Sequence, residues 1–172
     1  MPKIPELRTD RLILRGLRAR DAEAIAEQIG DWDVIRMLAR PPYPYSAGQA
    51  RDYLSKAVGY PWEYAVTLPG DDRLMGIVGV TGHLGYWLGR AHWGRGYMTE
   101  AAGALVDAYF ATAKSDRIIS GAFSDNPASA GVLRKLGFAE TGRSRQMCVA
   151  RGTRVDHLDF ALTRHDWMAR AA

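Results

Sequence analysis

Apolar positions recur along this chain with two different spacings, and the spacing predicts which segments form helices and which form strands. Asp21 and Ser46 each stand just before a helical pattern, and Gln49 occupies the capping-box position relative to Ser46. The prolines in ARPPYPY lack an amide donor and therefore predict a loop. The elements expected in this first part are a strand over 11–17, a helix over 21–29, a short helical turn over 31–38, a loop over 39–45 and a helix over 46–58.

The rest of the chain alternates between short apolar strands and two further helices. PGDD (69–72) and ARGTR (150–154) are predicted turns, while Pro127 suits the start of a helix and Gly137 its end. The expected elements are strands over 62–68, 73–81 and 82–88, a helix over 97–113, a strand over 118–123, a helix over 127–137 and strands over 138–148 and 154–163. The order predicts a mixed α/β (α+β) fold with a mostly antiparallel sheet flanked by helices. The length of 172 residues fits a single domain over 1–172.

Composition narrows the class of protein. Apolar residues make up 47% and charged residues 24% of the chain, and no apolar run is long enough to span a bilayer. The single cysteine, Cys148, excludes an intramolecular disulfide and a cysteine metal cluster, so no metal site is expected. The charged N-terminus does not resemble a signal peptide, which predicts a cytoplasmic protein. The net charge of +4 comes from dispersed arginines without a helix-turn-helix or zinc-finger pattern, so neither a nucleic-acid nor a membrane partner is expected.

The most informative segment is HWGRGYMTEA (92–101), which follows an apolar strand and opens an alanine-rich helix. Gly94 and Gly96 allow a tight turn, and the free amides at a helix N-terminus can cradle a phosphate or pyrophosphate. Arg95 and Arg90 add positive charge. The segment is neither a Walker loop nor a dinucleotide-binding fingerprint, and an ordinary strand-to-helix turn would also contain glycine.

A resemblance extends this interpretation over nearly the whole chain. The segment LGYWLGRAHWGRGYMTEAAGALVDAYF resembles the acetyl-CoA-binding core of the GNAT superfamily of N-acetyltransferases, within the group of ribosomal-protein N-terminal acetyltransferases that includes RimJ and RimL. LRTDRLILRGLRARDAEAI, SDNPASAGVLRKLGF and GTRVDHLDFALTRHDW resemble three other parts of that group in the same order. The resemblance implies a V-shaped sheet that splits between the strands at 82–88 and 118–123, an acetyl-CoA cosubstrate and an acetyl-transfer reaction.

The resemblance also implies which residues bind the cofactor. Pantetheine is expected along the backbone of Tyr86, Trp87 and Leu88, and the pyrophosphate loop falls on 93–98, where Trp93 and Met98 differ from the family pattern. Asn126 and Ser129 are expected near the pantetheine arm, and Arg134 and Lys135 near the ribose phosphate. The full set of expected cofactor residues is Tyr86, Trp87, Leu88, Trp93, Gly94, Arg95, Gly96, Tyr97, Met98, Thr99, Asn126, Ser129, Arg134 and Lys135.

Acetyl transfer to an amine requires a neutral amine, a polarised thioester carbonyl and a protonated leaving thiolate. Many family members supply the acid from a tyrosine on the second cofactor helix, where this chain has Leu133; Ser129 is the expected substitute, although SDNP is also an ordinary helix cap. His83 and Glu100 are the first candidates for the base, followed by Asp33 and Glu63.

The acceptor is expected to be a primary amine, on a protein N-terminus or on a small molecule. Its pocket is expected to involve Trp32, Tyr43, Trp62 and Tyr86, with Tyr45 as a further aromatic candidate. The chain is expected to act as a monomer or homodimer. The alternative is a non-catalytic acyl-CoA-binding sensor on the same fold.

Overall fold

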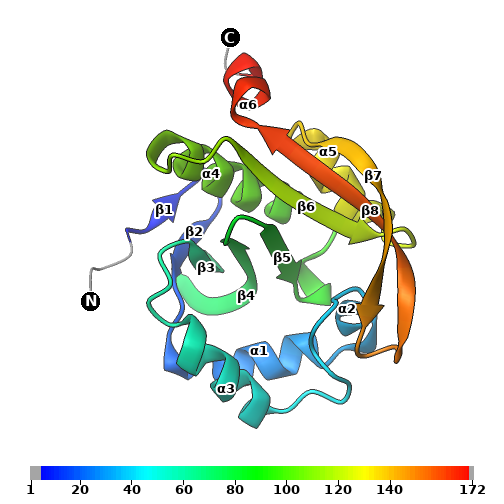
Figure 1. The fold of residues 1–172 in the computed structure, drawn as a ribbon. Helices are drawn as coiled ribbons and strands as arrows, with labels where there is room; N and C mark the ends of the chain where they lie inside the picture. Colours follow the sequence, from blue (N-terminus) through cyan, green and yellow to red (C-terminus); the bar gives the residue numbers. More distant parts are fainter. Residues whose placement is uncertain (1–4, 171–172) are drawn as a thin grey trace.

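The computed structural model describes residues 5–170, which form two antiparallel sheets flanked by helices (Figure 1). The first sheet has the order β1-β2-β3-β4-β5, and each strand is antiparallel to its neighbour. The second sheet has the order β6-β8-β7 and is also antiparallel. The strands are β1 Leu7–Arg8, β2 Ile13–Gly16, β3 Glu63–Leu68, β4 Asp71–Val80, β5 Leu84–Leu88, β6 Arg117–Phe123, β7 Ala139–Cys148 and β8 Thr153–Thr163.

Helices cover both faces of the first sheet. The helices are α1 Ala22–Ile29, α2 Trp32–Ile35, α3 Ala47–Ala57, α4 Tyr97–Thr112, α5 Pro127–Lys135 and α6 Arg164–Arg170. On one face, α1 and α3 pack against Ala65, Leu74 and Ile77. On the other face, α4 buries Leu105 and Val106 in the larger core cluster. This arrangement follows from the alternation of side chains along the strands, which sends neighbouring residues to opposite helical layers.

The local signals that start and end helices are mostly confirmed. The Ser46 hydroxyl accepts from the Gln49 amide at 3.2 Å, while the Gln49 side chain accepts from the Ser46 amide at 2.8 Å. Pro127 stands in the first turn of α5, and Gly137 has a φ of +86°, the left-handed conformation that ends many helices. These residues therefore fix the length of α3 and α5 as their sequences predict.

Asp21 does not act as the side-chain cap that the sequence predicts for α1. It stands at the N-cap of α1, but its carboxylate forms no capping bond. It accepts instead from the buried Arg15 guanidinium at 2.9 and 2.8 Å and from the Arg18 amide at 2.8 Å. Because Arg15 is only 2% exposed, its charge needs a close carboxylate, and this requirement overrides the local capping preference.

Three other segments also differ from the sequence-based expectation. The predicted strand over 11–17 is shorter, and the two-residue strand β1 precedes it. The turn predicted over 69–72 is limited to Pro69 and Gly70, because β4 already begins at Asp71. Helix α6 was not predicted; the side chain of its first residue, Arg164, donates to the Phe110 carbonyl at 2.7 Å.

The two sheets meet at one point and then diverge. His83 and Ile119 form a single parallel bridge, and the Ser120 hydroxyl donates to the Leu84 carbonyl at 2.8 Å. Beyond this contact β5 and β6 do not pair, so the expected split between these two strands is confirmed (Figure 1).

Candidate active site

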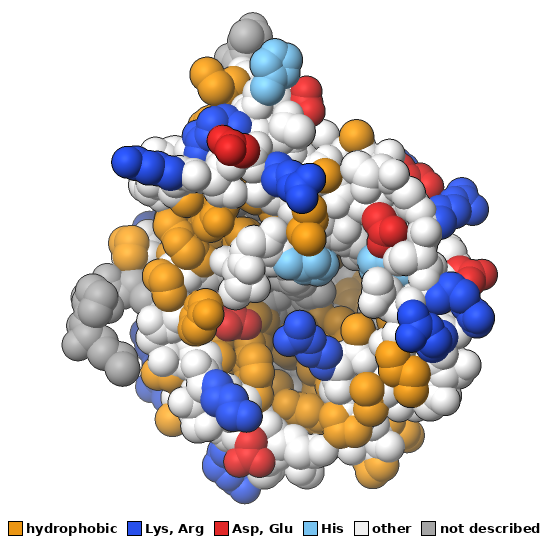
Figure 2. All heavy atoms as spheres, viewed as in Figure 1, with side chains coloured by type: hydrophobic (Ala, Val, Ile, Leu, Met, Phe, Trp, Pro, Cys, Tyr) orange, Lys and Arg blue, Asp and Glu red, His pale blue; other side chains and the backbone are white. Residues whose placement is uncertain are grey.

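The split between the sheets opens into a cleft of about 1700 Å³, lined by β5, β6, the N-terminal ends of α4 and α5, and the loop after α2. Figure 2 shows the hollow on this face, with histidine side chains at its rim. Pockets for one small ligand are usually about 300–1000 Å³. The cleft therefore has room for an extended cofactor together with a second substrate.

One edge of β5 forms a wall of this cleft. On its other edge, Trp87 is opposite Ile77 and the Gly89 amide donates to the Met75 carbonyl at 2.8 Å. Because hydrogen bonding alternates along an antiparallel pair, the amides and carbonyls of Tyr86 and Leu88 point away from β4, into the cleft. The Leu88 carbonyl accepts from the Trp93 indole at 2.9 Å. An extended ligand with amide groups can therefore add to β5 as a further strand.

The glycine-rich turn lies at one end of this wall. Gly94 and Gly96 have φ values of +73° and +75°, and Gly96 is the N-cap of α4. The helix begins with Tyr97, Met98 and Thr99, which line the cleft. Amides in the first turn of a helix have no partner within the helix and attract anions. This turn is therefore the part of the cleft best suited to a pyrophosphate.

The two departures from the family pattern are compatible with that role. The Met98 side chain is 7% exposed and packs in the main core cluster, which leaves its backbone at the cleft. The Trp93 side chain folds back onto the Leu88 carbonyl and links the turn to β5. Arg95 contributes its carbonyl, which accepts from Arg11 at 2.9 Å, and its side chain does not line the cleft.

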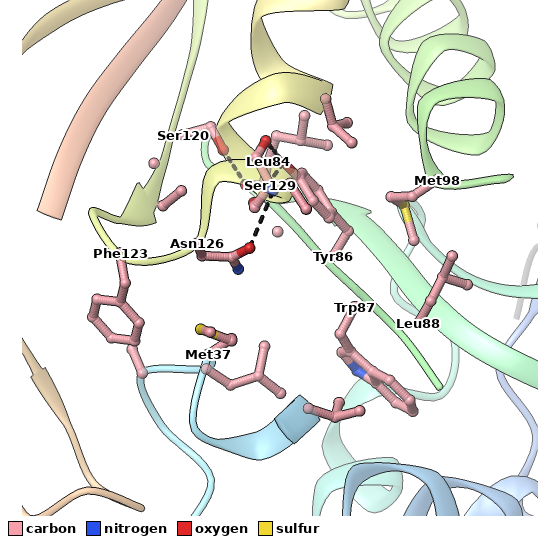
Figure 3. Close-up of a pocket in the computed structure, with 18 of the residues that line it drawn as sticks. Met37, Leu84, Tyr86, Trp87, Leu88, Met98, Ser120, Phe123, Asn126 and Ser129 are labelled. Atoms are coloured by element: carbon pink, nitrogen blue, oxygen red, sulfur yellow. Dashed lines mark hydrogen bonds between the residues drawn. The ribbon is translucent and has the colours of Figure 1, made fainter. Parts of the chain in front are cut away.

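The N-terminal end of α5 brings Asn126, Ser129 and Tyr86 together (Figure 3). The Asn126 side chain accepts from the Ser129 amide at 3.2 Å. The Tyr86 hydroxyl lies 2.9 Å from Ser129 Oγ and 3.0 Å from the Ser129 carbonyl. Burial raises the pKa of Tyr86 to about 12, although its bond with Ser129 opposes this effect, so the phenol is neutral near pH 7. A neutral phenol therefore lies on β5 next to Ser129, whereas α5 itself has Leu133 where many family members have tyrosine.

Glu100 does not lie in the cleft, which argues against its predicted role as the base. Its carboxylate accepts from Thr9 Oγ1 at 2.5 Å and from Arg11 Nε at 2.7 Å. Burial alone would raise the pKa of Glu100, but these hydrogen bonds hold it below its ordinary value. Glu100 and Arg11 instead support the glycine-rich turn from outside, because Arg11 also binds the Arg95 carbonyl and lies 4.9 Å above the Tyr97 ring.

The other candidates for the base all line the cleft, in different settings. His83 stands at the meeting point of the sheets; burial by the surrounding walls lowers its pKa, and His157 and Arg40 lower it further. Asp33 forms ion pairs with Arg90 at 3.0 Å and Arg36 at 3.4 Å. Glu63 accepts a hydrogen bond from the Tyr53 hydroxyl.

Of the four aromatic residues expected at the acceptor, only Tyr86 lines the cleft. Trp32 and Tyr43 pack edge-to-face on each other, 5.0 Å between ring centres, and are 42% and 50% exposed. Trp62 packs on Tyr109, 5.2 Å away, because strand alternation sends it to the opposite face from Glu63. The other aromatic residues that line the cleft include Trp87, Tyr45 and Tyr53, and Tyr53 was not among the predicted residues.

Of the two basic residues on α5 that were expected to bind the cofactor, only one lines the cleft. Lys135 lines the cleft, whereas Arg134 pairs with Glu140 at 3.3 Å and lies 5.5 Å above the Phe160 ring.

A histidine–carboxylate pair on β8 was also missed. His157 Nδ1 lies 2.8 Å from an Asp159 carboxylate oxygen, which also accepts from Ser144 Oγ at 2.9 Å. A side chain at Gly121 would collide with the His157 ring, so the glycine makes room for it. The signal was the H-x-D spacing in DHLDF, which places both residues on one face of a strand.

Comparisons with known proteins agree with this geometry. A sequence model of the acetyltransferase (GNAT) domain family matches residues 11–139, three quarters of the chain. The chain belongs to the GNAT acetyltransferase family. Membership of this family identifies the protein as an acetyltransferase that uses acetyl-CoA. The two antiparallel sheets flanked by helices confirm the predicted fold class.

Among relatives, the [ribosomal protein uS5]-alanine N-acetyltransferase of Escherichia coli is 27% identical, over 97% of this chain and 94% of the relative. A GNAT-family acetyltransferase from Bacillus anthracis has a similar structure, with a TM-score of 0.82 and 23% identity over 94% of this chain and 99% of the other. RimL, a ribosomal L7/L12 α-N-protein acetyltransferase solved with coenzyme A, has a TM-score of 0.76 and 20% identity over 92% and 98% of the two chains.

Within residues 5–170, no helix is both long and apolar enough to cross a membrane. In the same part of the chain, no group of three or more histidine, cysteine or acidic side chains is arranged to hold a metal ion.

The left-handed conformation at Gly96 gives a direct test of the pyrophosphate turn. We expect Gly96→Val to raise the dissociation constant for acetyl-CoA at least about tenfold, because a β-branched residue avoids positive φ and would reorient the first amides of α4. Isothermal titration calorimetry measures the change. Gly70→Val is the matched control: its φ is +82°, but it lies in the turn between β3 and β4 and does not line the cleft. Equal affinities of both variants would contradict the assignment.

Proposed function

We propose that this enzyme transfers the acetyl group of acetyl-CoA to a primary amine by direct attack, without a covalent enzyme intermediate. The observation that carries the proposal is the open edge of β5, which runs through a cleft that also presents His83 and the Tyr86–Ser129 pair. Cys148 is not a competing nucleophile, because it is buried and its thiol lies against the Arg36 and Leu38 carbonyls. The acceptor is a protein N-terminus or a small amine.

The cofactor is held mainly by backbone. Pantetheine amides pair with Tyr86 and Leu88 on β5, and the pyrophosphate binds the first amides of α4. Lys135 lies on the cleft wall, where its ammonium group can neutralise a phosphate. Residues from β4 through β8 contribute to the cleft, which supports one acetyltransferase domain over 1–172.

The amine reaches the enzyme mainly as an ammonium ion and must lose a proton before it attacks. His83 is the proposed base because it lies at the meeting point of the sheets and opens onto the cleft. A lowered pKa keeps more of this imidazole neutral near pH 7, in the form that can accept a proton. The free amine then attacks the thioester carbon, whose oxygen is polarised by a β5 amide.

Collapse of the tetrahedral intermediate breaks the carbon–sulfur bond, and the sulfur needs a proton. Ser129 Oγ is the proposed donor, with the Tyr86 hydroxyl 2.9 Å behind it. As Ser129 releases its proton to sulfur, Tyr86 can turn its own proton from the Ser129 carbonyl to Ser129 Oγ. Direct reaction between two bound substrates explains why the cleft must hold both at once.

A screen for thiol release tests the function as a whole. With acetyl-CoA and a panel of peptides and small amines, we expect amine-dependent release of coenzyme A and intersecting lines in double-reciprocal plots. Parallel lines, or an acetylated enzyme isolated before the amine is added, would instead indicate a covalent intermediate. Tight cofactor binding without turnover on any amine would favour the sensor alternative.

The role of Ser129 is separable from cofactor binding. We expect Ser129→Ala to lower kcat about 100-fold, a usual loss for a general acid, with little change in the KM for acetyl-CoA. Tyr86→Phe should give a smaller loss, and the double variant should be no worse than Ser129→Ala, since both act through one proton path. The control is Ser55→Ala. The Ser55 hydroxyl donates to the Asp52 carbonyl on the exposed side of α3. A normal kcat in Ser129→Ala would remove it from the mechanism.

The role of His83 appears in the pH dependence. Because its pKa lies below 6.5, we expect the wild-type kcat/KM for the amine to be level between about pH 7 and 8 and to fall as the pH drops below 6.5. In His83→Gln only the unprotonated amine reacts, so kcat/KM should keep rising through pH 8. Profiles of the same shape in both enzymes would show that His83 is not the base.

A further inference from the structure

A row of three aligned positions crosses the acceptor side of the first sheet. Glu63 on β3 is opposite Gly79 on β4, and Gly79 is opposite Gly85 on β5. Residues directly opposite each other project from the same face of a sheet, and all three positions line the cleft. The row therefore connects the edge where the thioester binds with a single carboxylate.

The two glycines keep this path open. A side chain added at Gly79 would meet Glu63 Cγ at 3.2 Å, so the space above Gly79 is open to the Glu63 side chain only because position 79 is a glycine. At Gly85 nothing lies within 4 Å of an added Cβ, so that position faces open space in the cleft. Nothing of the sheet itself separates the reacting amine from Glu63.

Glu63 is only partly exposed, and one of its oxygens accepts from the Tyr53 hydroxyl. Burial and the neighbouring Glu63 charge raise the pKa of Tyr53, so the phenol remains a donor. No lysine, arginine or histidine within residues 5–170 forms an ion pair with Glu63. Ile77, Trp87 and Tyr45 line the same cleft and add apolar and aromatic surface to it. A carboxylate in such a setting is stabilised by a cation, which the ligand can supply.

We propose that Glu63 and Tyr53 bind a second cationic group of the acceptor, so that the preferred substrate is a diamine or an amine that carries another basic group. This inference rests on the proposed acetyl transfer and specifies its acceptor. Adjacent strands are about 5 Å apart, so the β3 backbone lies roughly 15 Å from an acetyl-pantetheine arm that adds to the β5 edge. The Glu63 side chain, which extends over Gly79, shortens that path by up to about 5 Å. The two nitrogen atoms of the acceptor are then separated by about four to six carbon atoms.

Arg40 presents the competing chemistry. It lines the same cleft, close enough to lower the pKa of His83, and would favour an acceptor with a carboxylate. The two possibilities predict opposite orders of preference among amines of equal length, so one panel separates them.

The experiment compares 1,4-diaminobutane, 1,5-diaminopentane and 1,6-diaminohexane with 1-aminobutane and 4-aminobutanoate, by coenzyme A release. We expect kcat/KM for the best diamine to exceed that for the monoamine at least about tenfold. Glu63→Gln keeps the size and the Tyr53 contact but removes the charge. It should abolish this preference and leave the monoamine rate within about twofold. Glu23→Gln, at a 70% exposed side chain on α1, is the matched control.

A second variant tests the path rather than the charge. Gly85→Val adds a side chain in the open space of the row, and we expect it to reduce the diamine preference while thermal unfolding is unchanged.

The outcomes are distinguishable. Equal rates for diamines and monoamine, or preference for 4-aminobutanoate, would overturn the Glu63 subsite and leave acetyl transfer intact. An equal loss for all amines in Glu63→Gln would assign Glu63 to proton transfer and also overturn it. Failure of every amine, with acetyl-CoA still bound, would overturn the proposed function and this inference with it.

Discussion

The backbone groups along one edge of β5 point into a cleft because β6 leaves β5 after a single bridge at His83 and Ile119. Unpaired backbone groups inside a protein are costly, and an extended ligand that contains amides can satisfy them. The helices that begin on either side of the cleft, α4 and α5, direct their N-terminal ends toward the same space. The parts of the proposed active site are therefore arranged around one interrupted sheet.

Because side chains alternate along β3 and β5, neighbouring residues project from opposite faces of the first sheet. Tyr86 projects toward α5 and Ser129, while Trp87 projects from the opposite face of the same strand (Figure 3). In the same way Trp62 packs with Tyr109 in the core, and Glu63 faces the acceptor side. In the proposed mechanism, one face of the first sheet presents the proton donor to the leaving group, and the other face presents Glu63 to the amine.

Charged side chains that do not enter the cleft support its walls. Arg11 links Glu100, the Arg95 carbonyl and the Tyr97 ring, and so supports the glycine-rich turn from behind. Arg15 is buried between Asp21 and Asp72 and ties β2 to the start of α1 and to β4. Both arginines satisfy several acceptors with one planar group, which a lysine could not do.

The sequence by itself determined the order of the elements between β2 and β8, the α3 and α5 helix signals, the fold class and the position of the glycine-rich turn. These features depend on local spacing and on backbone conformations that few residues adopt, and both are visible in a linear chain. The resemblance of ordered motifs identified the family from the same information. Most of the expected cofactor residues line the cleft, because they follow one another along two short segments, 86–99 and 126–135.

Only the tertiary structure decided which distant side chains meet. Glu100 was a candidate base by position in its helix, but Arg11, 89 residues away along the chain, binds its carboxylate outside the cleft. Asp21 lost its capping role to Arg15, and Trp32, Tyr43 and Trp62 pack away from the cleft. Conversely, Tyr53 reaches Glu63, and His157 faces the cleft with Asp159. Ion pairs, and the face of the sheet from which a side chain projects, depend on neighbours that are distant in the sequence, so the local spacing of residues does not predict them.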